Sequence, residues 1–308
     1  MQDARAKEKA LNTRSLHGQW KNVKMCSPAR TREKCKNVQS RTDKRRMLKN
    51  VQSRTDKRRM LKNVQSRTER GDHMAANLEK CTAVIVAAGS GRRMGGKVSK
   101  QFLELKGRPL LAYTLDVFQN SQRIDEIILV VGKDTTDYVR ENIVEKYGYT
   151  KVSRLVIGGT ERYESVYAGL LACVDADYVF IHDGVRPFVT GDIIERGYQT
   201  ARQYGTAVCA VQAKDTIKIV NEKGVVSETP IRTKVWSVQT PQIFRYDLIR
   251  KAYDTLQMFD KDGITDDAMV LEEMGNSDVH VFQGDYFNIK ITTPEDLDIA
   301  ERFLEKKT

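Results

Sequence analysis

The chain has 308 residues, which is enough for one large α/β domain or two small ones. Its formal net charge of +11 is uneven, because residues 1–70 carry 22 Lys and Arg against 6 Asp and Glu, whereas the rest carries 30 against 35. This balance gives no electrostatic case for nucleic-acid binding by residues 71–308, the body of the chain. No apolar run reaches the roughly 18 residues of a membrane span. Five cysteines without a CxxC pair and only four histidines argue against a zinc site. Cys81, Cys173 and Cys209 lie in or beside apolar stretches, as buried free thiols do, which favours a reducing, cytoplasmic location.

The basic part of the chain is repetitive. The unit "KNVQSRTDKRRML" occupies residues 36–48 and again 49–61, and a third copy begins at 62. Each full copy offers only Val, Met and Leu as apolar side chains, too few to build a core. We interpret residues 1–76 as a basic tail that is disordered or artefactual, with an RNA- or membrane-surface-binding arm as the alternative. Residues 77–308 then form the folded domain.

From residue 82 onward the sequence alternates between strand and helix patterns. Apolar and β-branched runs predict strands at 82–87, 126–131, 154–157, 178–182, 206–212 and 278–283. Stretches with helical spacing predict helices at 108–120, 134–146, 161–174, 191–204, 246–258, 263–275 and 293–307. This order predicts a Rossmann-like, mainly parallel α/β sheet with helices on both faces.

Local signals refine this prediction at the helix starts. Pro109 suits the first helical position of its helix, and Thr190 suits the N-cap of the helix that follows it. We expect Thr265 to cap another helix, with two aspartates in its first turn.

Two stretches do not fit the alternation. Residues 213–236 are polar and β-prone and have no helical period, which predicts a β-arm that protrudes from the domain. The sequence "SVQTPQIF" after this arm predicts a tight loop at Thr240, Pro241 and Gln242.

The first strand leads into the glycine-rich sequence "AAGSGRRMGGKVSKQ" at 87–101, a pattern typical of a phosphate-binding loop. A Walker A loop needs Ser or Thr where this chain has Val98, and a dinucleotide fingerprint needs its third glycine where this chain has Met94. Glycines nevertheless let backbone N–H groups approach an anion, and Arg93 and Lys100 add positive charge. The loop therefore predicts phosphate binding of neither standard kind.

Further charged residues follow later strands. Asp183 comes directly after the strand at 178–182, and one or two carboxylates suffice to hold magnesium bound to a nucleotide. Arg186 can turn back toward a phosphate, although a structural ion pair with Asp183 is the alternative. Lys290 stands in β-prone sequence, where burial is costly without an anionic partner. Because ligands bind at the carboxyl ends of parallel strands, we expect these groups to form one composite site.

Eight blocks of the body, taken in order, resemble a single family. They are "AAGSGRRM", "KQ", "GGTERYESV", "HDGVRP", "KDTIK", "RTKVWSVQTPQ", "TDDA" and "NIKITTPEDL". The body resembles the 2-C-methyl-D-erythritol 4-phosphate cytidylyltransferases of isoprenoid-precursor synthesis, which have a nucleotidyltransferase-type fold. The resemblance implies that CTP and methylerythritol phosphate react to give a CDP-alcohol and pyrophosphate, with Mg²⁺ or another divalent cation.

The resemblance also implies residue roles. The residues around the α-phosphate and its leaving group would be Arg93, Lys100 and Lys290. The nucleotide would be bound by Ala87, Ala88, Gly89, Gly91, Gly159, Thr160, Ser165 and Asp183, and Asp183 would also hold the metal. The polyol phosphate would be bound by Arg186, Thr240 and Thr265, completed by Thr216 and Arg232 from the arm of the other subunit in a homodimer.

Two other functions remain open from the sequence. A ribitol 5-phosphate cytidylyltransferase would share the fold and the chemistry, but "VAAG", Trp236-Ser237-Val238 and Lys218 favour methylerythritol phosphate. An RNA-binding protein with a basic arm and an inactive nucleotide fold is the second alternative. The retention of the charged residues Arg93, Lys100, Asp183 and Lys290 argues against inactivity.

Overall fold

The computed structural model of the chain describes residues 79–89, 99–259, 263–275 and 277–306. The chain divides by spatial contacts into Met1–Met74 and Ala75–Thr308, and only the second unit contains described residues. The tail expected at residues 1–76 therefore lies outside the described residues, and its boundary stays a prediction. Within the described ranges, no helix combines the length and the apolar character needed to cross a bilayer.

The centre of the described domain is a seven-stranded sheet with the order β11-β7-β10-β6-β1-β4-β5. Its strands are β1 Cys81–Ala87, β4 Glu126–Val131, β5 Val152–Ile157, β6 Tyr178–Asp183, β7 Thr206–Gln212, β10 Trp236–Arg245 and β11 Val281–Gln283. Neighbouring strands are parallel except where β10 pairs antiparallel with β6 and β7. The prediction of a mainly parallel sheet is confirmed.

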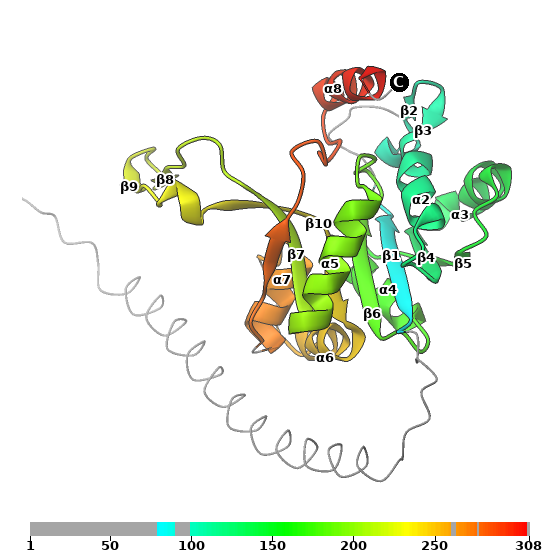
Figure 1. Ribbon diagram of the computed structural model, residues 1–308, viewed down its shortest axis with the longest axis horizontal. Coiled ribbons are helices and arrows are strands. Elements are labelled where there is room, and N and C mark those ends of the chain that lie inside the picture. Colours follow the sequence, from blue (N-terminus) through cyan, green and yellow to red (C-terminus); the bar gives the residue numbers. More distant parts are fainter. Residues whose placement is uncertain (1–78, 90–98, 260–262, 276, 307–308) are drawn as a thin grey trace, which may run out of the picture. The chain divides into compact units, whose positions relative to one another are not determined.

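Helices cover both faces of this sheet, as predicted (Figure 1). The α-helices of the described residues are α2 Leu110–Asn120, α3 Thr136–Val139, α4 Arg162–Ala172, α5 Gly191–Tyr204, α6 Tyr246–Leu256, α7 Asp267–Val270 and α8 Pro294–Glu305. Side chains of α2, α3 and α5 share one buried cluster with the sheet, and side chains of α4, α6 and α7 share the other. The helix α8 packs in a third, smaller cluster with Leu105, Leu110, Phe188 and Ile291.

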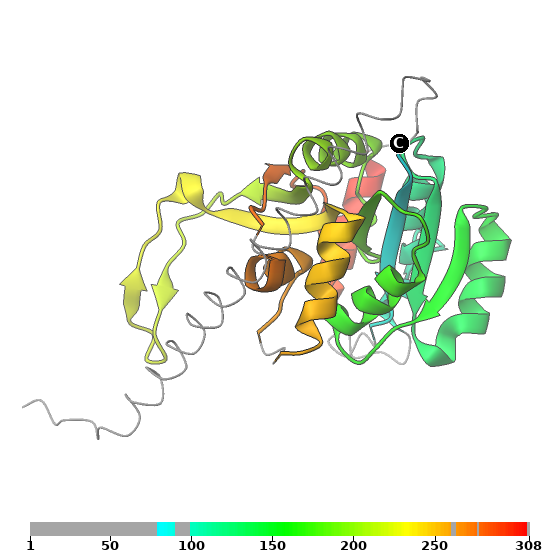
Figure 2. The same cartoon turned by 90° about the horizontal axis from the view of Figure 1, so that it is seen from below.

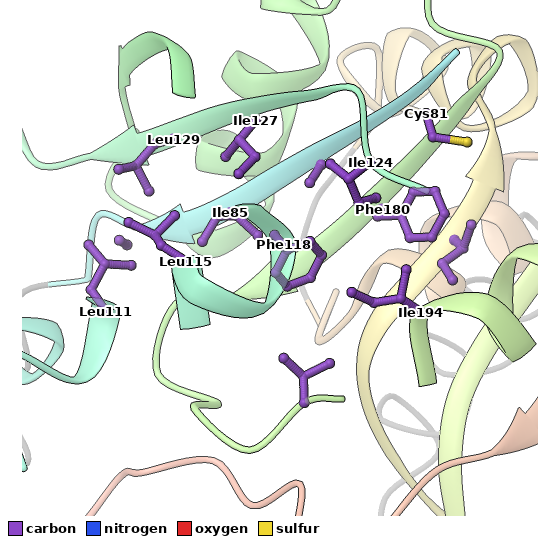
Figure 3. Close-up of a cluster of buried hydrophobic side chains, with 14 of the residues drawn as sticks. Cys81, Ile85, Leu111, Leu115, Phe118, Ile124, Ile127, Leu129, Phe180 and Ile194 are labelled. Atoms are coloured by element: carbon purple, nitrogen blue, oxygen red, sulfur yellow. The ribbon is translucent and has the colours of Figure 1, made fainter. Parts of the chain in front are cut away.

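The apolar run of β1 explains its central place in the sheet. Successive side chains of a strand point to opposite faces, and both faces of β1 are buried. Ile85 contributes to the cluster beneath α2 and α5, together with Phe118 and Ile194 (Figure 3). Its neighbour Val84 contributes to the opposite cluster beneath α4. A strand in this position requires apolar residues at consecutive positions, as the sequence has.

The expected loop at Thr240–Gln242 is wrong, because these residues lie within the ten-residue strand β10. The pairing of β10 with β7 shifts between Val238, opposite Ala210, and Gln242, opposite Val208. Proline has no backbone N–H to donate to a neighbouring strand, and an irregularity in the ladder accommodates it. A proline therefore interrupts the register here without ending the strand.

Helix boundaries also differ in detail. Pro109 is the N-cap of α2 and not its first residue. The segment expected as a single helix at 134–146 consists of a 3₁₀ turn at Lys133–Thr135, the short α3 and a π-helical stretch at Arg140–Glu145. Propensity and periodicity indicate that such a segment is helical, but not which hydrogen-bond pattern it adopts.

Of the two predicted side-chain caps, one is confirmed and one is wrong. Thr190 caps α5, since its side chain accepts a hydrogen bond from the Ile193 amide at 3.3 Å. The cap of α7 is Asp266, whose Oδ1 accepts from the Met269 amide at 2.9 Å, so Thr265 lies one residue outside the helix. The second carboxylate oxygen of Asp266 accepts from Gln242 Nε2 at 2.9 Å, which anchors this start to β10.

The expected β-arm is present at residues 213–236. It carries the short antiparallel strands β8 Ile219–Val220 and β9 Val226–Glu228 and a 3₁₀ turn at Arg232–Lys234. Figure 2 shows the arm extending away from the sheet. Several of its large apolar side chains are exposed, among them Val225 and Ile231. Within the described chain they therefore have no buried core to pack into.

Candidate active site

A pocket of about 350 Å³ opens at the carboxyl ends of β1 and β6. Its lining includes these residues predicted for the site: Ala87, Ala88, Gly89, Lys100, Gly159, Thr160, Ser165, Asp183 and Lys290. They come from four separate stretches of the sequence, and the structure brings them together in one pocket, although Arg186, which we also expected there, is not among the described lining residues. Arg93 and Gly91 lie outside the described residues.

The backbone on one side of the pocket is tightly packed around Gly158 and Gly159. A Cβ atom on Gly158 would lie 2.4 Å from Ala88 Cβ and 2.6 Å from Ser165 Oγ. The amide of Gly159 donates to Ser165 Oγ at 3.1 Å, and the amide of Thr160 donates to Glu164 Oε2 at 2.8 Å. The absence of a side chain at Gly158 therefore lets this loop pack closely against Ala88 and Ser165, and the next residues, Gly159 and Thr160, line the pocket.

Lys100 and Lys290 are both held near the pocket by buried neighbours. Gln101, directly after Lys100, is buried and donates from Nε2 to the carbonyl oxygen of Ala87 at 2.7 Å. Ile291, directly after Lys290, is fully buried, and its amide donates to the carbonyl oxygen of Val185 at 2.9 Å. The backbone of each lysine is therefore fixed by the buried residue that comes after it, which limits where the ammonium group can lie.

Asp183 is the buried carboxylate of the pocket, and three cations surround it. Arg162 Nε lies 3.1 Å from Oδ1, while Lys290 Nζ lies 2.9 Å and Arg186 Nε 3.5 Å from Oδ2. Burial raises the pKa of Asp183, but the charges of Arg162, Lys290 and Arg186 outweigh it and hold the pKa well below its ordinary value. The carboxylate is therefore ionised, and it is an anionic partner of Lys290.

The carboxylate of Asp183 is suited to be the protein ligand of a metal ion whose other ligands are mainly phosphate oxygens. It lines the pocket, it is ionised, and carboxylate oxygens are the ligands that Mg²⁺ prefers. Among the described residues there is no cluster of three or more His, Cys, Asp or Glu side chains that could bind a metal on its own. Such an ion would therefore depend on the nucleotide for most of its coordination.

Arg162 is the residue of this pocket that our sequence reasoning missed. Its guanidinium donates from Nη1 and Nη2 to the two carboxylate oxygens of Asp267, at 3.0 and 2.8 Å, as well as from Nε to Asp183. Arg162 does stand in the quoted block "GGTERYESV", but its partner Asp267 lies far along the chain in the block "TDDA". Each block taken alone gave no sign of this pair.

Arg186 and Thr240 lie behind Asp183 and are not among the described residues that line the pocket. Arg186 Nη1 donates to the carbonyl oxygen of Asn288 at 2.8 Å. The hydroxyl of Thr240 accepts from the Asp183 amide at 3.1 Å and lies 3.0 Å from His182 Nδ1. Because His182 Nε2 faces only the carbonyl oxygen of Arg186, that nitrogen carries the proton and Thr240 donates to Nδ1.

We expect His182 to make stability depend on pH. Burial lowers the pKa of His182 from 6.5 to about 3, and the charges of Arg186 and Arg162 act in the same direction, opposed by Asp183. Below pH 6.5 His182 binds a proton in the unfolded chain but stays neutral in the folded chain. The free energy of unfolding should therefore fall by about 2 kcal/mol between pH 7 and pH 5. Urea denaturation at both pH values measures this fall.

The control for this prediction is His182→Asn, which removes the titrating group. The variant should show a shallower decrease in the free energy of unfolding between the same pH values, whatever its absolute stability. Equal decreases in the two proteins would show that His182 does not cause the effect.

The remaining predicted substrate residues lie away from the pocket lining of their own chain. Thr265 is exposed just before α7, and its hydroxyl lies 3.8 Å from Met269 Sδ. Thr216 and Arg232 are exposed on the arm, where Arg232 Nη1 donates to the carbonyl oxygen of Lys214 at 3.3 Å. Their roles in substrate binding stay predictions.

The parallel sheet, with a pocket of backbone amides, two lysines and one ionised carboxylate at its carboxyl edge, defines an α/β nucleotidyltransferase-like protein. The family model "IspD: 2-C-methyl-D-erythritol 4-phosphate cytidylyltransferase" matches residues 81–306. The chain therefore belongs to this family and is a cytidylyltransferase, as the resemblance in sequence implied.

Individual relatives agree with this assignment. A 2-C-methyl-D-erythritol 4-phosphate cytidylyltransferase of Clostridium botulinum (strain Loch Maree / Type A3) is 50% identical over 232 residues, which cover 75% of this chain and 100% of the relative. A protein of the same name from Alkaliphilus oremlandii is 49% identical over 232 residues, covering 75% of this chain and 98% of the relative.

Solved structures agree as well. The 4-diphosphocytidyl-2C-methyl-D-erythritol synthase of Anaerococcus prevotii superposes with a TM-score of 0.66 at 36% identity, covering 74% of this chain and 100% of that one. The cytidylyltransferase of Francisella tularensis superposes with a TM-score of 0.62 at 29% identity, covering 73% and 99%. The fold and the family are thus supported by both sequence and structure.

Proposed function

We propose that the chain transfers the cytidylyl group of CTP to 2-C-methyl-D-erythritol 4-phosphate, giving 4-diphosphocytidyl-2-C-methyl-D-erythritol and pyrophosphate in isoprenoid-precursor synthesis. A phosphate oxygen of the acceptor attacks the α-phosphorus, and the bond to the bridging oxygen of the β-phosphate breaks, so that pyrophosphate leaves with the electron pair. The observation that carries the proposal is the pocket that Lys100, Lys290 and Asp183 line together with the closely packed backbone at Gly159.

The acceptor phosphate is already an anion, so the reaction needs little help from a general base. Its main requirement is positioning and the neutralisation of charge on the five-coordinate phosphorus. We assign this role to Lys100 and Lys290 from the described pocket and to Arg93 from the glycine-rich loop. Lys290, which is paired with Asp183, would turn toward the phosphates when they bind.

We place the nucleotide base in the part of the pocket lined by Gly159, Thr160 and Ser165. We assign base and ribose recognition to the backbone groups near Ala87, Ala88, Gly89, Gly91, Gly159 and Thr160, with the side chain of Ser165. Support comes from the pocket lining, which includes all of these residues except Gly91, a residue outside the described ranges. Asp183 would hold a divalent cation, Mg²⁺ in particular, and when bound this cation would neutralise charge on the triphosphate.

The acceptor pocket would be completed by a second subunit. We assign Arg186, Thr240 and Thr265 to the polyol phosphate in one subunit, together with Thr216 and Arg232 contributed by the arm of the other. The exposed apolar side chains on the arm support a homodimer, because exchange of arms would bury them. The three described cysteines are free and buried, which supports a reducing, cytoplasmic location.

The test is pyrophosphate release with CTP and each candidate polyol phosphate under matched conditions. We expect turnover with methylerythritol phosphate and a clear preference for it over ribitol 5-phosphate. A preference for ribitol 5-phosphate would overturn the acceptor, and undiminished turnover in excess chelator would overturn the metal.

A further inference from the structure

Arg162 connects two carboxylates that belong to different halves of the proposed site. It is the first residue of α4, Asp183 is the last residue of β6, and Asp267 is the first residue of α7. The guanidinium uses Nε for Asp183 and both terminal nitrogens for Asp267. A single side chain therefore joins the ends of three elements at the pocket.

The two sides of this contact are unequal. Asp267 is fully buried and accepts from Arg162 through both oxygens, and the hydroxyl of Tyr253 also donates to its Oδ1 at 2.6 Å. A buried carboxylate needs such a paired, hydrogen-bonded cation, because removal of one partner leaves an uncompensated charge. Asp267 and Tyr253 thus fix the guanidinium in place, and Arg162 presents its remaining Nε to Asp183.

The two oxygens of Asp183 are divided between different cations. Arg162 contacts Oδ1, whereas Lys290 and Arg186 are closest to Oδ2. Lys290 has a flexible side chain that is 35% exposed, and one ammonium group makes its contact. If the lysine turns to a phosphate, the Arg162 contact to Oδ1 remains and Asp183 keeps its orientation.

The partner of Arg162 also lies next to the expected acceptor site. Asp267 begins α7, directly after the cap Asp266 and two residues after Thr265, which the proposed function places at the polyol phosphate. Movement of this helix start would shift Thr265 relative to the nucleotide. A rigid link between Asp183 and Asp267 would prevent that movement.

We propose that Arg162 is a positioning residue that orients Asp183 and holds the start of α7 in register with it, so that the nucleotide and acceptor halves of the site are coupled. This inference rests on the proposed function. Lysine cannot replace the arginine, because its single ammonium group cannot make the bidentate contact and reach the second carboxylate at the same time. Asp267, which is not among the described residues lining the pocket, acts through Arg162 alone.

The first experiment compares kcat and KM for Arg162→Lys, Asp267→Asn and the double variant. Each single variant should lose about tenfold in kcat with KM for CTP nearly unchanged, and the double variant should be no worse than the single ones, because all three break the same link. The control is Arg123→Lys, which alters a similar Arg pair with Glu195 outside the pocket. Unchanged kcat in Asp267→Asn together with a loss in Arg162→Lys would overturn the proposal, since Arg162 would then act on the substrate directly.

A second experiment measures the coupling without turnover. The melting temperature is recorded with methylerythritol phosphate, with a CTP analogue whose α,β-bridge is a methylene group, and with both. In the wild type and in Arg123→Lys, the shift with both ligands should exceed the sum of the separate shifts, whereas in Arg162→Lys it should equal that sum. Retained synergy in Arg162→Lys would overturn the proposal. A wild type that releases no pyrophosphate would instead overturn the proposed function, because the melting experiment does not depend on catalysis.

If Asp267→Asn does not fold, chemical rescue replaces it. Arg162→Ala, confirmed as folded by its melting transition, should regain part of its kcat when guanidinium ion is added far below denaturing concentrations, because the free ion can bridge the two carboxylates. Absence of rescue in the folded variant would overturn the proposal.

Discussion

Lys100→Ala is expected to lower kcat by about a hundredfold, equivalent to about 3 kcal/mol in the activation barrier. Lys100 lines the pocket with Lys290 and Asp183, and the buried residue Gln101 fixes its backbone through the hydrogen bond to Ala87. Negative charge on the α-phosphate and on the departing pyrophosphate grows as the reaction proceeds. A cation held at this point stabilises the transition state more than the bound substrates, so its loss should affect kcat more than KM for CTP.

Steady-state pyrophosphate release measures this loss, and Lys106→Ala is the matched control. Lys106 lies six residues further along the chain, and its side chain pairs with Glu305 at 2.8 Å on the surface. An exposed ion pair contributes little to stability, so the control should keep its wild-type kcat. A kcat for Lys100→Ala within about threefold of the wild type would remove Lys100 from the catalytic residues.

The strands that could be predicted from the sequence are those whose own residues carry the pattern of a buried strand. β1 is apolar apart from Thr82, and β6 has the apolar run Tyr178 to Ile181. A strand buried on both faces needs this pattern, so both could be predicted without knowledge of the neighbours. Asp183 could be predicted as a pocket residue, because a carboxylate at the end of such a strand lies at the carboxyl edge of the sheet.

The features missed depend on contacts between distant segments. The role that we propose for Arg162 depends on its contact with Asp267, and no local pattern indicates that the starts of α4 and α7 meet. The sequence around Pro241 predicts a tight loop, yet pairing of β10 with two flanking strands keeps this segment extended. In both cases tertiary pairing decides the structure, and the local sequence alone favours another interpretation.

The cap of α7 was misplaced for a related reason. Thr265 and Asp266 are both good capping residues, and sequence preference barely separates them. The contact of Asp266 with Gln242 of β10 ties this residue to the sheet, and its other oxygen then caps the helix. The contact with β10 therefore determines which of the two adjacent residues caps α7.

Mixing two inactive variants is expected to restore activity if subunits share their sites. Arg232 is exposed on the arm and lies outside the pocket lining of its own chain, whereas Lys100 lines that pocket. If the arm completes the acceptor site of the partner, Arg232→Ala should abolish most acceptor binding, because arginine can grip a phosphate with two parallel N–H donors. Lys100→Ala should abolish most turnover in its own subunit.

A heterodimer of Arg232→Ala and Lys100→Ala subunits would contain one intact site and one site with both defects. The intact site combines Lys100 of the first subunit with Arg232 of the second. Random exchange places about half of the chains in heterodimers, so an equal mixture should recover about a quarter of wild-type activity.

Pyrophosphate release after exchange, with heterodimers confirmed by native mass spectrometry, measures the recovery. An equal mixture of Arg232→Ala with wild type, diluted to the same number of intact sites, gives the reference rate. If confirmed heterodimers stay inactive, Arg232 serves its own chain, and the arm binds no substrate of the partner subunit.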